Sequence, residues 1–135
     1  MNDTYLGLDY GKRFIGVAVG SALTNKAEPL GVVTAHKGVP NWDQLDKFIT
    51  TWQPQALIIG WPLNMDGTEQ NLTQAVRVFE NNLTIRYQLQ CHHVDERLST
   101  YEAKKILGKK QKDKKKVDAT SAVVLLEQWL QESNI

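Results

Sequence analysis

The chain has 135 residues, of which 41% are hydrophobic and 23% charged, and its formal net charge is +1. These values are typical of one globular domain, expected over 1–135. No apolar run is long enough to span a bilayer, and the N-terminus lacks a signal-peptide pattern. The single cysteine, Cys91, excludes an internal disulfide. We therefore expect a cytoplasmic protein without a membrane partner.

Three strands are predicted in the N-terminal third. The first covers 5–9, and the second, 14–19, alternates Ile and Val with small residues. The short turn at Gly11 forces these two strands to be antiparallel. A third strand is expected over 30–35, after an irregular loop and before a break at 38–40.

Helices and strands are predicted to alternate in the remaining chain. A helix capped by Asn41 or Asp43 ends before Pro54. The apolar run 56–59 is typical of a strand covered on both faces. The later predicted elements are a loop over 60–67, a helix from Thr68, a strand over 89–94, a short helix from Ser99 to Gly108, and a final helix from about Asp118 to Glu132.

This order of elements predicts an α/β fold with a ribonuclease-H-like mixed five-stranded sheet. Three antiparallel strands come first, and the later strands, joined by helical crossovers, should be parallel. Helices are expected on both faces. Strands that share a direction bring their carboxyl ends to one edge of the sheet, where functional sites form.

Acidic residues occupy three element ends that this edge would bring together. They are Asp9, the pair Asp95 and Glu96, and Asp118. Neighbouring carboxylates repel one another unless a cation binds them, and oxygen ligands favour Mg²⁺ or Mn²⁺. Two such ions activate water and stabilise the leaving oxygen in phosphodiester hydrolysis. We therefore predict a metal site formed by Asp9, Asp95, Glu96 and Asp118.

Each of these positions also has a structural interpretation that the sequence leaves open. Asp9 is a residue type favoured in turns, and Asp118 is a suitable helix cap. Asp95, Glu96 and Arg97 are compatible with a surface ion-pair cluster. Strand alternation also points Asp95 and Glu96 to opposite faces, so only one of them would face the site.

Basic residues are concentrated in one segment. Eight of the 16 lysines and arginines lie between Lys104 and Lys116, which leaves the rest of the chain acidic. Such a local cationic segment is typical of a protein that binds a polyanion. A solvated, solubilising loop over 109–116 is the alternative. For Trp61, His92 and His93 we favour packing over ligand contact.

Four segments together resemble the YqgF (RuvX) family of small bacterial proteins with a ribonuclease-H-like fold. They read LGLDYG followed by IGVA at 6–18, GWPLNMDGT at 60–68, DERLST at 95–100 and VDATSA at 117–122. The resemblance implies that Asp9, Glu96 and Asp118 are the catalytic carboxylates and that Asp95 adjoins them. It also implies that the loop with Asn64, Asp66 and Gly67 lines the site, and that Arg97 and Ser99-Thr100 belong to the motif after the fifth strand.

The function expected from this resemblance is metal-dependent cleavage of structured nucleic acid, first of all at the 5′ end of pre-16S rRNA. The alternatives are a Holliday junction resolvase acting on branched DNA and a non-catalytic nucleic-acid-binding assembly factor. The protein should be a monomer or a weak homodimer. The expected nucleic-acid-binding residues are Lys12, Arg13, Asn64, Arg97, Lys109, Lys110, Lys112, Lys114, Lys115 and Lys116.

Overall fold

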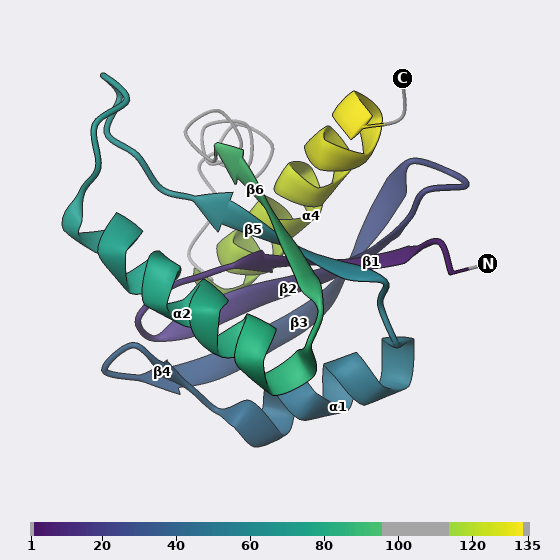
Figure 1. The fold of residues 1–135 in the computed structure, drawn as a ribbon, viewed down its shortest axis with the longest axis horizontal. Coiled ribbons are helices and arrows are strands. Elements are labelled where there is room, and N and C mark those ends of the chain that lie inside the picture. The colour runs from purple at the N-terminus through teal and green to yellow at the C-terminus, as the bar shows by residue number, and fades with distance from the viewer. Residues whose placement is uncertain (1, 96–113, 134–135) are drawn as a thin grey trace.

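A six-stranded mixed sheet forms the centre of the molecule, in the order β4-β3-β2-β1-β5-β6 (Figure 1). The computed structural model describes residues 2–95 and 114–133, and of residues 114–118 only the backbone. The strands are β1 (Thr4–Asp9), β2 (Phe14–Ser21), β3 (Lys26–His36), β4 (Val39–Pro40), β5 (Ala56–Trp61) and β6 (Gln90–Asp95). Neighbours from β4 to β1 are antiparallel, whereas β1, β5 and β6 are parallel. The predicted mixed α/β fold is confirmed, with β4 as a sixth strand.

Helices cover both faces of this sheet, as predicted. Helices α1 (Trp42–Trp52) and α2 (Asn71–Tyr87) lie on one face, and α4 (Lys114–Ser133) crosses the other (Figure 1). In β5, Leu57 and Ile59 belong to the core cluster on the α1 and α2 face, and Ile58 belongs to the cluster on the α4 face. The continuous apolar run of β5 therefore reflects burial on both sides.

Helix α4 lies very close to β1 because a glycine faces it. A Cβ on Gly7 would lie 2.9 Å from Leu126 Cβ and 3.0 Å from the Ala122 carbonyl oxygen. Near the start of the same strand, the rings of Tyr5 and Trp129 are 5.0 Å apart. The start of β1 thus meets the end of α4, so the two elements run in opposite directions.

Helices α1 and α2 are joined by a polar clamp. The Asp46 carboxylate accepts hydrogen bonds from Arg86 Nε at 2.9 Å, Arg86 Nη2 at 2.7 Å and the Tyr87 hydroxyl at 2.6 Å. The Arg86 guanidinium lies 5.1 Å from the centre of the Trp42 ring. The Arg86 hydrogen bond, followed by that of Tyr87, lowers the pKa of Asp46 from 3.8 to about 2.

The third strand is longer than the sequence predicts. It begins at Lys26 and includes Glu28-Pro29, which we expected to end a loop. The register shifts opposite Val17 and Ala18, and this bulge accommodates Pro29, which has no N–H for the ladder. The expected break at 38–40 contains β4, which pairs with Ala35 and His36.

Helix boundaries also differ from the prediction. Helix α2 begins at Asn71 rather than Thr68, and α4 begins at Lys114 rather than near Asp118. The predicted loop at 109–116 is therefore wrong for its last three lysines, which are helical. Trp52, the last residue of α1, is 40% exposed. The predicted helix from Ser99 to Gly108 lies outside the described residues. No helix in the described ranges is long and apolar enough to cross a membrane.

Candidate functional site

Asp9 is the last residue of β1 and lies on the α4 face of the sheet. Side chains alternate along a strand, so Asp9 shares its face with Tyr5 and Gly7, and both of these contact α4. Asp9 pairs with Gly16 of β2 as part of the ladder, which makes it a strand residue rather than a turn residue. The open interpretation of Asp9 as a turn residue is therefore wrong.

Asp118 occupies a helix position that brings its backbone toward the same end of β1. The step from Gly7 to Asp9 covers about 6.6 Å of strand. The step from Ala122 to Asp118 covers about 6 Å of helix and keeps the same helix face. One step runs forward along β1 and the other runs backward along α4. Because the two elements have opposite directions, both steps lead toward the same end of the sheet. Asp118 also lies one turn inside α4, so it is not the helix cap.

Asp95 ends β6 and lies on the opposite face of the sheet. It pairs with Trp61, and alternation gives it the face of His93 and Cys91, which contact α2 and its core cluster. His92 and Val94 have the α4 face instead, where His92 packs against Trp129 with ring centres 5.0 Å apart. Asp95 therefore does not share the face of Asp9. Glu96 and Arg97 lie outside the described residues.

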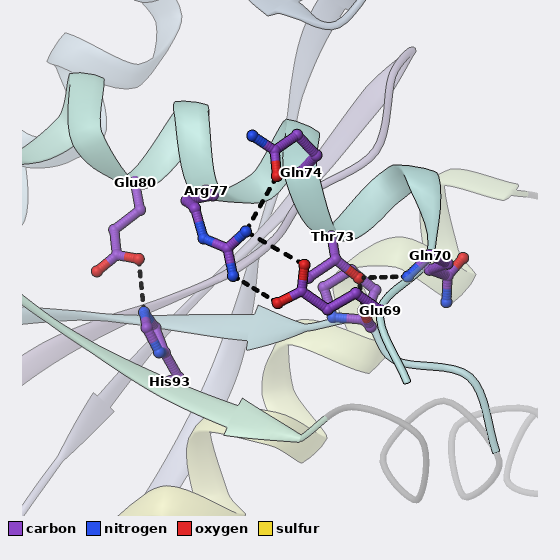
Figure 2. A network of polar contacts seen from close by, with 8 residues as sticks. Glu69, Gln70, Thr73, Gln74, Arg77, Glu80 and His93 are labelled. Atoms are coloured by element: carbon purple, nitrogen blue, oxygen red, sulfur yellow. Dashed lines mark hydrogen bonds and ion pairs between the residues drawn. The ribbon is translucent and has the colours of Figure 1, made fainter. Parts of the chain in front are cut away.

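A stacked cluster lies where β5 and β6 meet the start of α2. The Trp61 and His93 rings stack with centres 4.1 Å apart, and the Arg77 guanidinium lies 5.3 Å from the Trp61 ring. Figure 2 shows Glu80 beside His93, at 2.5 Å, and Arg77 held by Glu69 and Gln74. The Arg77 hydrogen bond lowers the pKa of Glu69. Packing is thus confirmed for Trp61.

The loop between β5 and α2 is held by its own hydrogen bonds. The Asn64 amide donates to Thr68 Oγ1 at 3.0 Å, and Asp66 Oδ1 accepts from Thr68 Oγ1 at 2.6 Å. At the loop's base, Thr73 Oγ1 accepts from the Gln70 N–H at 3.0 Å and donates to the Pro62 carbonyl oxygen (Figure 2). Asn64 is exposed in this loop, which begins directly after Trp61 at the end of β5.

The predicted basic residues divide into three groups. Lys12 and Arg13 are exposed in the turn that follows Asp9. Lys114, Lys115 and Lys116 form the first turn of α4, of which the backbone alone is described. Lys109, Lys110 and Lys112, like Arg97, lie outside the described residues. Two of the predicted cations, Lys12 and Arg13, therefore lie in the turn at the end of the sheet where β1 ends in Asp9.

The candidate metal ligands at this edge are carboxylates. Among the described side chains, no group of three His, Cys, Asp or Glu residues is close enough to hold a metal ion. The described side chains include those of Asp9 and Asp95 but not those of Glu96 and Asp118. Burial raises the pKa of the Cys91 thiol, which keeps it protonated and unsuited to act as a nucleophile.

Two functional candidates were missed by the sequence reasoning. Arg77 stacks on Trp61 at the end of β5, although the spacing of residues along α2 does not predict this contact. Lys37 is exposed in the β3–β4 turn, at the same end of the sheet as Asp9. The signal that was available for Lys37 is the Lys37-Gly38 pair, a turn sequence between two extended segments.

Comparisons with known proteins agree with this fold. The RuvX family model, described as Holliday junction resolvase, matches residues 3–132. A Shewanella denitrificans protein named "Putative pre-16S rRNA nuclease" is 46% identical over 97% of this chain and 96% of its own length. A Legionella pneumophila (strain Paris) protein of the same name is 49% identical over 96% of each.

Solved structures of similar fold are more distant in sequence. Thermus thermophilus RuvC in complex with a Holliday junction substrate superposes with a TM-score of 0.57 at 14% identity, over 98% of both chains. The yeast mitochondrial Holliday junction resolvase Ydc2 has a TM-score of 0.57 at 9% identity, over 94% of this chain and 77% of its own. At these identities the likeness shows the fold alone.

Proposed function

The chain belongs to the RuvX family, and on that basis we propose that it is a metal-dependent endonuclease that hydrolyses phosphodiester bonds in structured nucleic acid. The observation that carries this proposal is the common location of Asp9 and the Asp118 backbone, at one end of β1 and on one face of the sheet. The nuclease domain would comprise the whole of 1–135.

The proposed catalytic carboxylates are Asp9, Glu96 and Asp118. Strand alternation supports Glu96 over Asp95, because Asp95 has the face opposite to Asp9. This all-oxygen ligand set fits Mg²⁺ or Mn²⁺, and Asp9 supplies a carboxylate at the correct edge. Such ions, when bound, stabilise the charge on the phosphoryl oxygens and lower the pKa of a bound water.

The protein's own residues would bind and orient the substrate. Lys12 and Arg13 are exposed immediately after Asp9 and suit the phosphates beside the scissile bond. The lysines from 109 to 116 would add affinity that depends on salt and little on sequence. An A-form substrate would be recognised mainly by its shape.

The proposed substrate is the precursor of 16S rRNA, cut in the maturation of its 5′ end. Relatives 46% to 49% identical over almost the whole chain support this choice, since their name refers to that substrate. The proposed site of action is therefore the cytoplasm, where bacterial rRNA is processed.

Branched DNA is the second candidate substrate. The family description, Holliday junction resolvase, supports this alternative. Symmetric cutting of a junction requires two active sites related by a two-fold axis, hence a dimer. A monomer or a weak homodimer fits the rRNA substrate better, because one site suffices for one cut. A third alternative, of another class, is a nucleic-acid-binding assembly factor without catalysis.

Replacement of Asp9 by Asn tests catalysis directly. We expect Asp9→Asn to lower Mn²⁺-dependent cleavage of a structured RNA by more than about 100-fold, since even residues that only support metal ligands contribute 10–100-fold. Asp43→Asn, an exposed aspartate in α1, is the matched control and should cleave like wild type. Cleavage retained by Asp9→Asn would reject the assigned site, and a wild-type protein that binds RNA without cutting RNA or junction DNA would favour the assembly factor.

A further inference from the structure

The turn between β3 and β4 has a conformation that lysine rarely adopts. Lys37 has φ +50° and Gly38 has φ +85°, so both central residues of this two-residue turn are left-handed. Hairpins of this kind favour Asn-Gly, and a non-glycine residue such as lysine is disfavoured there by about 1–2 kcal/mol. The chain thus keeps a long cationic side chain at a position where backbone preference alone would select another residue.

This turn is fixed against the turn that carries Lys12 and Arg13. The Gly38 N–H donates to the Lys12 carbonyl oxygen at 3.1 Å, and the Ala35 N–H donates to the Arg13 carbonyl oxygen at 2.7 Å. The Tyr10 hydroxyl donates to the Gly38 carbonyl oxygen at 2.6 Å. Lys12 and Lys37 line one hollow of about 390 Å³ between the two turns and α2.

No acid among the side chains that the structure describes forms an ion pair with the three cations of these turns. Lys12, Arg13 and Lys37 are exposed. Within the described side chains, the ion pairs are Arg77 with Glu69, Arg86 with Asp46, and His93 with Glu80. Lys12, Arg13 and Lys37 therefore form a basic ridge across the ends of β1, β2 and β3, at the end of the sheet where β1 ends in Asp9. The hollow that Lys12 and Lys37 line lies on the α2 side of the sheet, whereas Asp9 lies on the α4 side.

The span of this ridge matches a short piece of nucleic acid. Two strand spacings separate β1 from β3, which is about 10 Å. Because successive phosphates of one strand lie farther apart than the rise of about 3.4 Å along the helix axis, that span corresponds to fewer than about three nucleotides. We propose that the β3–β4 turn is a phosphate clamp, in which Lys37, with Lys12 and Arg13, holds the backbone of the substrate within about three nucleotides of the bond cut at Asp9.

This inference rests on the proposed function, because it assigns the ridge to the same nucleic-acid substrate. The location of the ridge at the end of the sheet where β1 ends in Asp9 favours the substrate strand over the acidic segment of a protein partner. The bound groups are phosphates, which RNA and branched DNA share. Two probes therefore serve to separate these sources: a labelled RNA hairpin with a single-stranded 5′ flank, and a labelled four-way DNA junction.

Binding measured across a salt range tests the clamp. Fluorescence anisotropy with both probes, in EDTA to prevent hydrolysis, gives Kd for wild type, Lys37→Gln, Lys37→Arg and Lys37→Gly between 50 and 200 mM KCl. Lys37→Gln should reduce the slope of log Kd against log salt by about 0.7–0.9, so its defect is about threefold larger at 50 mM than at 200 mM. Lys37→Arg should retain most of the slope.

Two further variants separate charge from hairpin structure. Lys37→Gly relieves the left-handed backbone, so its thermal midpoint should rise while its affinity falls to that of Lys37→Gln. Lys47→Gln, which removes an exposed lysine from α1, should bind like wild type. Equal slopes for Lys37→Gln and Lys47→Gln, or weak binding by Lys37→Gly alone, would overturn the clamp while leaving the nuclease assignment standing. Absence of wild-type binding and cleavage with both probes would overturn both.

Discussion

At the scale of single residues, Gly7 determines how close α4 lies to β1, and with it the position of the Asp118 backbone relative to Asp9. The atoms that a Cβ on Gly7 would meet are a Cβ and a backbone carbonyl oxygen, and neither can turn aside. On Gly20 of β2, the nearest atoms are the ends of the Leu126 and Leu130 side chains, at 2.9 Å and 3.0 Å, and the Lys26 carbonyl oxygen at 3.1 Å. The two side-chain ends can move, so the carbonyl oxygen, the most distant of the three, is the one fixed obstacle.

The two glycines should therefore tolerate alanine unequally. We expect Gly7→Ala to lower the free energy of unfolding by about 1–3 kcal/mol through overpacking, and Gly20→Ala to lower it by less. Urea denaturation measures both values. Gly7→Ala should also reduce cleavage, because α4 must shift away from β1. A Gly7→Ala protein as stable as wild type, or more stable than Gly20→Ala, would contradict this account.

Individual site residues were predictable to different degrees. The place of Asp9 at the end of the first strand could be predicted from the apolar run before it and the Gly11 turn after it, and its catalytic role stays a prediction. The sequence could not decide whether Asp95 or Glu96 faces the site, because strand alternation shows only that their side chains have opposite faces. In the structure, the contacts of His92 with α4 and of His93 with α2 assign Asp95 to the α2 face. Lys37 was missed because the Lys37-Gly38 pair indicates a turn, whereas nothing in the sequence indicates that this turn lies at the same end of the sheet as Asp9.

At the scale of elements, the clamp between α1 and α2 links stability to pH. The folded-state pKa of Asp46, about 2, lies below its ordinary value of 3.8, so the group stabilises the fold above pH 4 and loses this effect as the pH falls toward 2. The Asp46 side chain is 37% exposed, and solvent screening limits the stabilisation to about 1 kcal/mol.

Replacement of Asp46 makes this pH dependence measurable. Asp46→Asn should be less stable than wild type by about 1 kcal/mol at pH 6, and the difference should shrink as the pH approaches 2, because protonation removes the same charge from wild type. Urea denaturation at pH 6, 4 and 2.5 provides the values. Asp43→Asn, on the same helix, should show no such trend. A stability difference for Asp46→Asn that stays constant across this range would be inconsistent with the clamp.

Element boundaries were predictable where hydrophobic patterns are strong. β5 has a continuous apolar run, and α1 has Asn41, whose side chain caps it by accepting from the Gln44 N–H. The start of β3 was missed because Pro29 indicates a loop locally, whereas a bulge tolerates it in the sheet. The start of α4 was missed because a lysine run resembles a solvated loop, although lysine is itself a good helix former.

At the scale of the whole molecule, one chain carries one proposed set of carboxylates. A single set makes a single cut, which suits the trimming of one RNA end, whereas a junction needs two sets in a dimer. Substrate choice and oligomeric state are therefore linked. The 5′ ends of cellular 16S rRNA report on the substrate.

Sequencing the 5′ ends of 16S rRNA tests the substrate in cells. Depletion of the protein should cause precursors with extended 5′ ends to accumulate. Wild-type protein should restore mature ends, Asp43→Asn should do the same, and Asp9→Asn should not. Normal 5′ ends during depletion would count against pre-16S rRNA and shift the assignment to branched DNA, where sedimentation of the wild-type protein should then detect a dimer.

The antiparallel packing of α4 on β1 has a consequence for the order in which the protein becomes active during its own synthesis. Asp9 is synthesised before the later strands and α4, and β1 to β3 can pair with one another through short connections. The helix that carries Asp118 follows all six strands in the chain, and until it docks, the glycine-bearing face of the sheet lacks the cover of α4. On the proposed function, a nascent chain is therefore catalytically silent until α4 has been synthesised and has docked on β1.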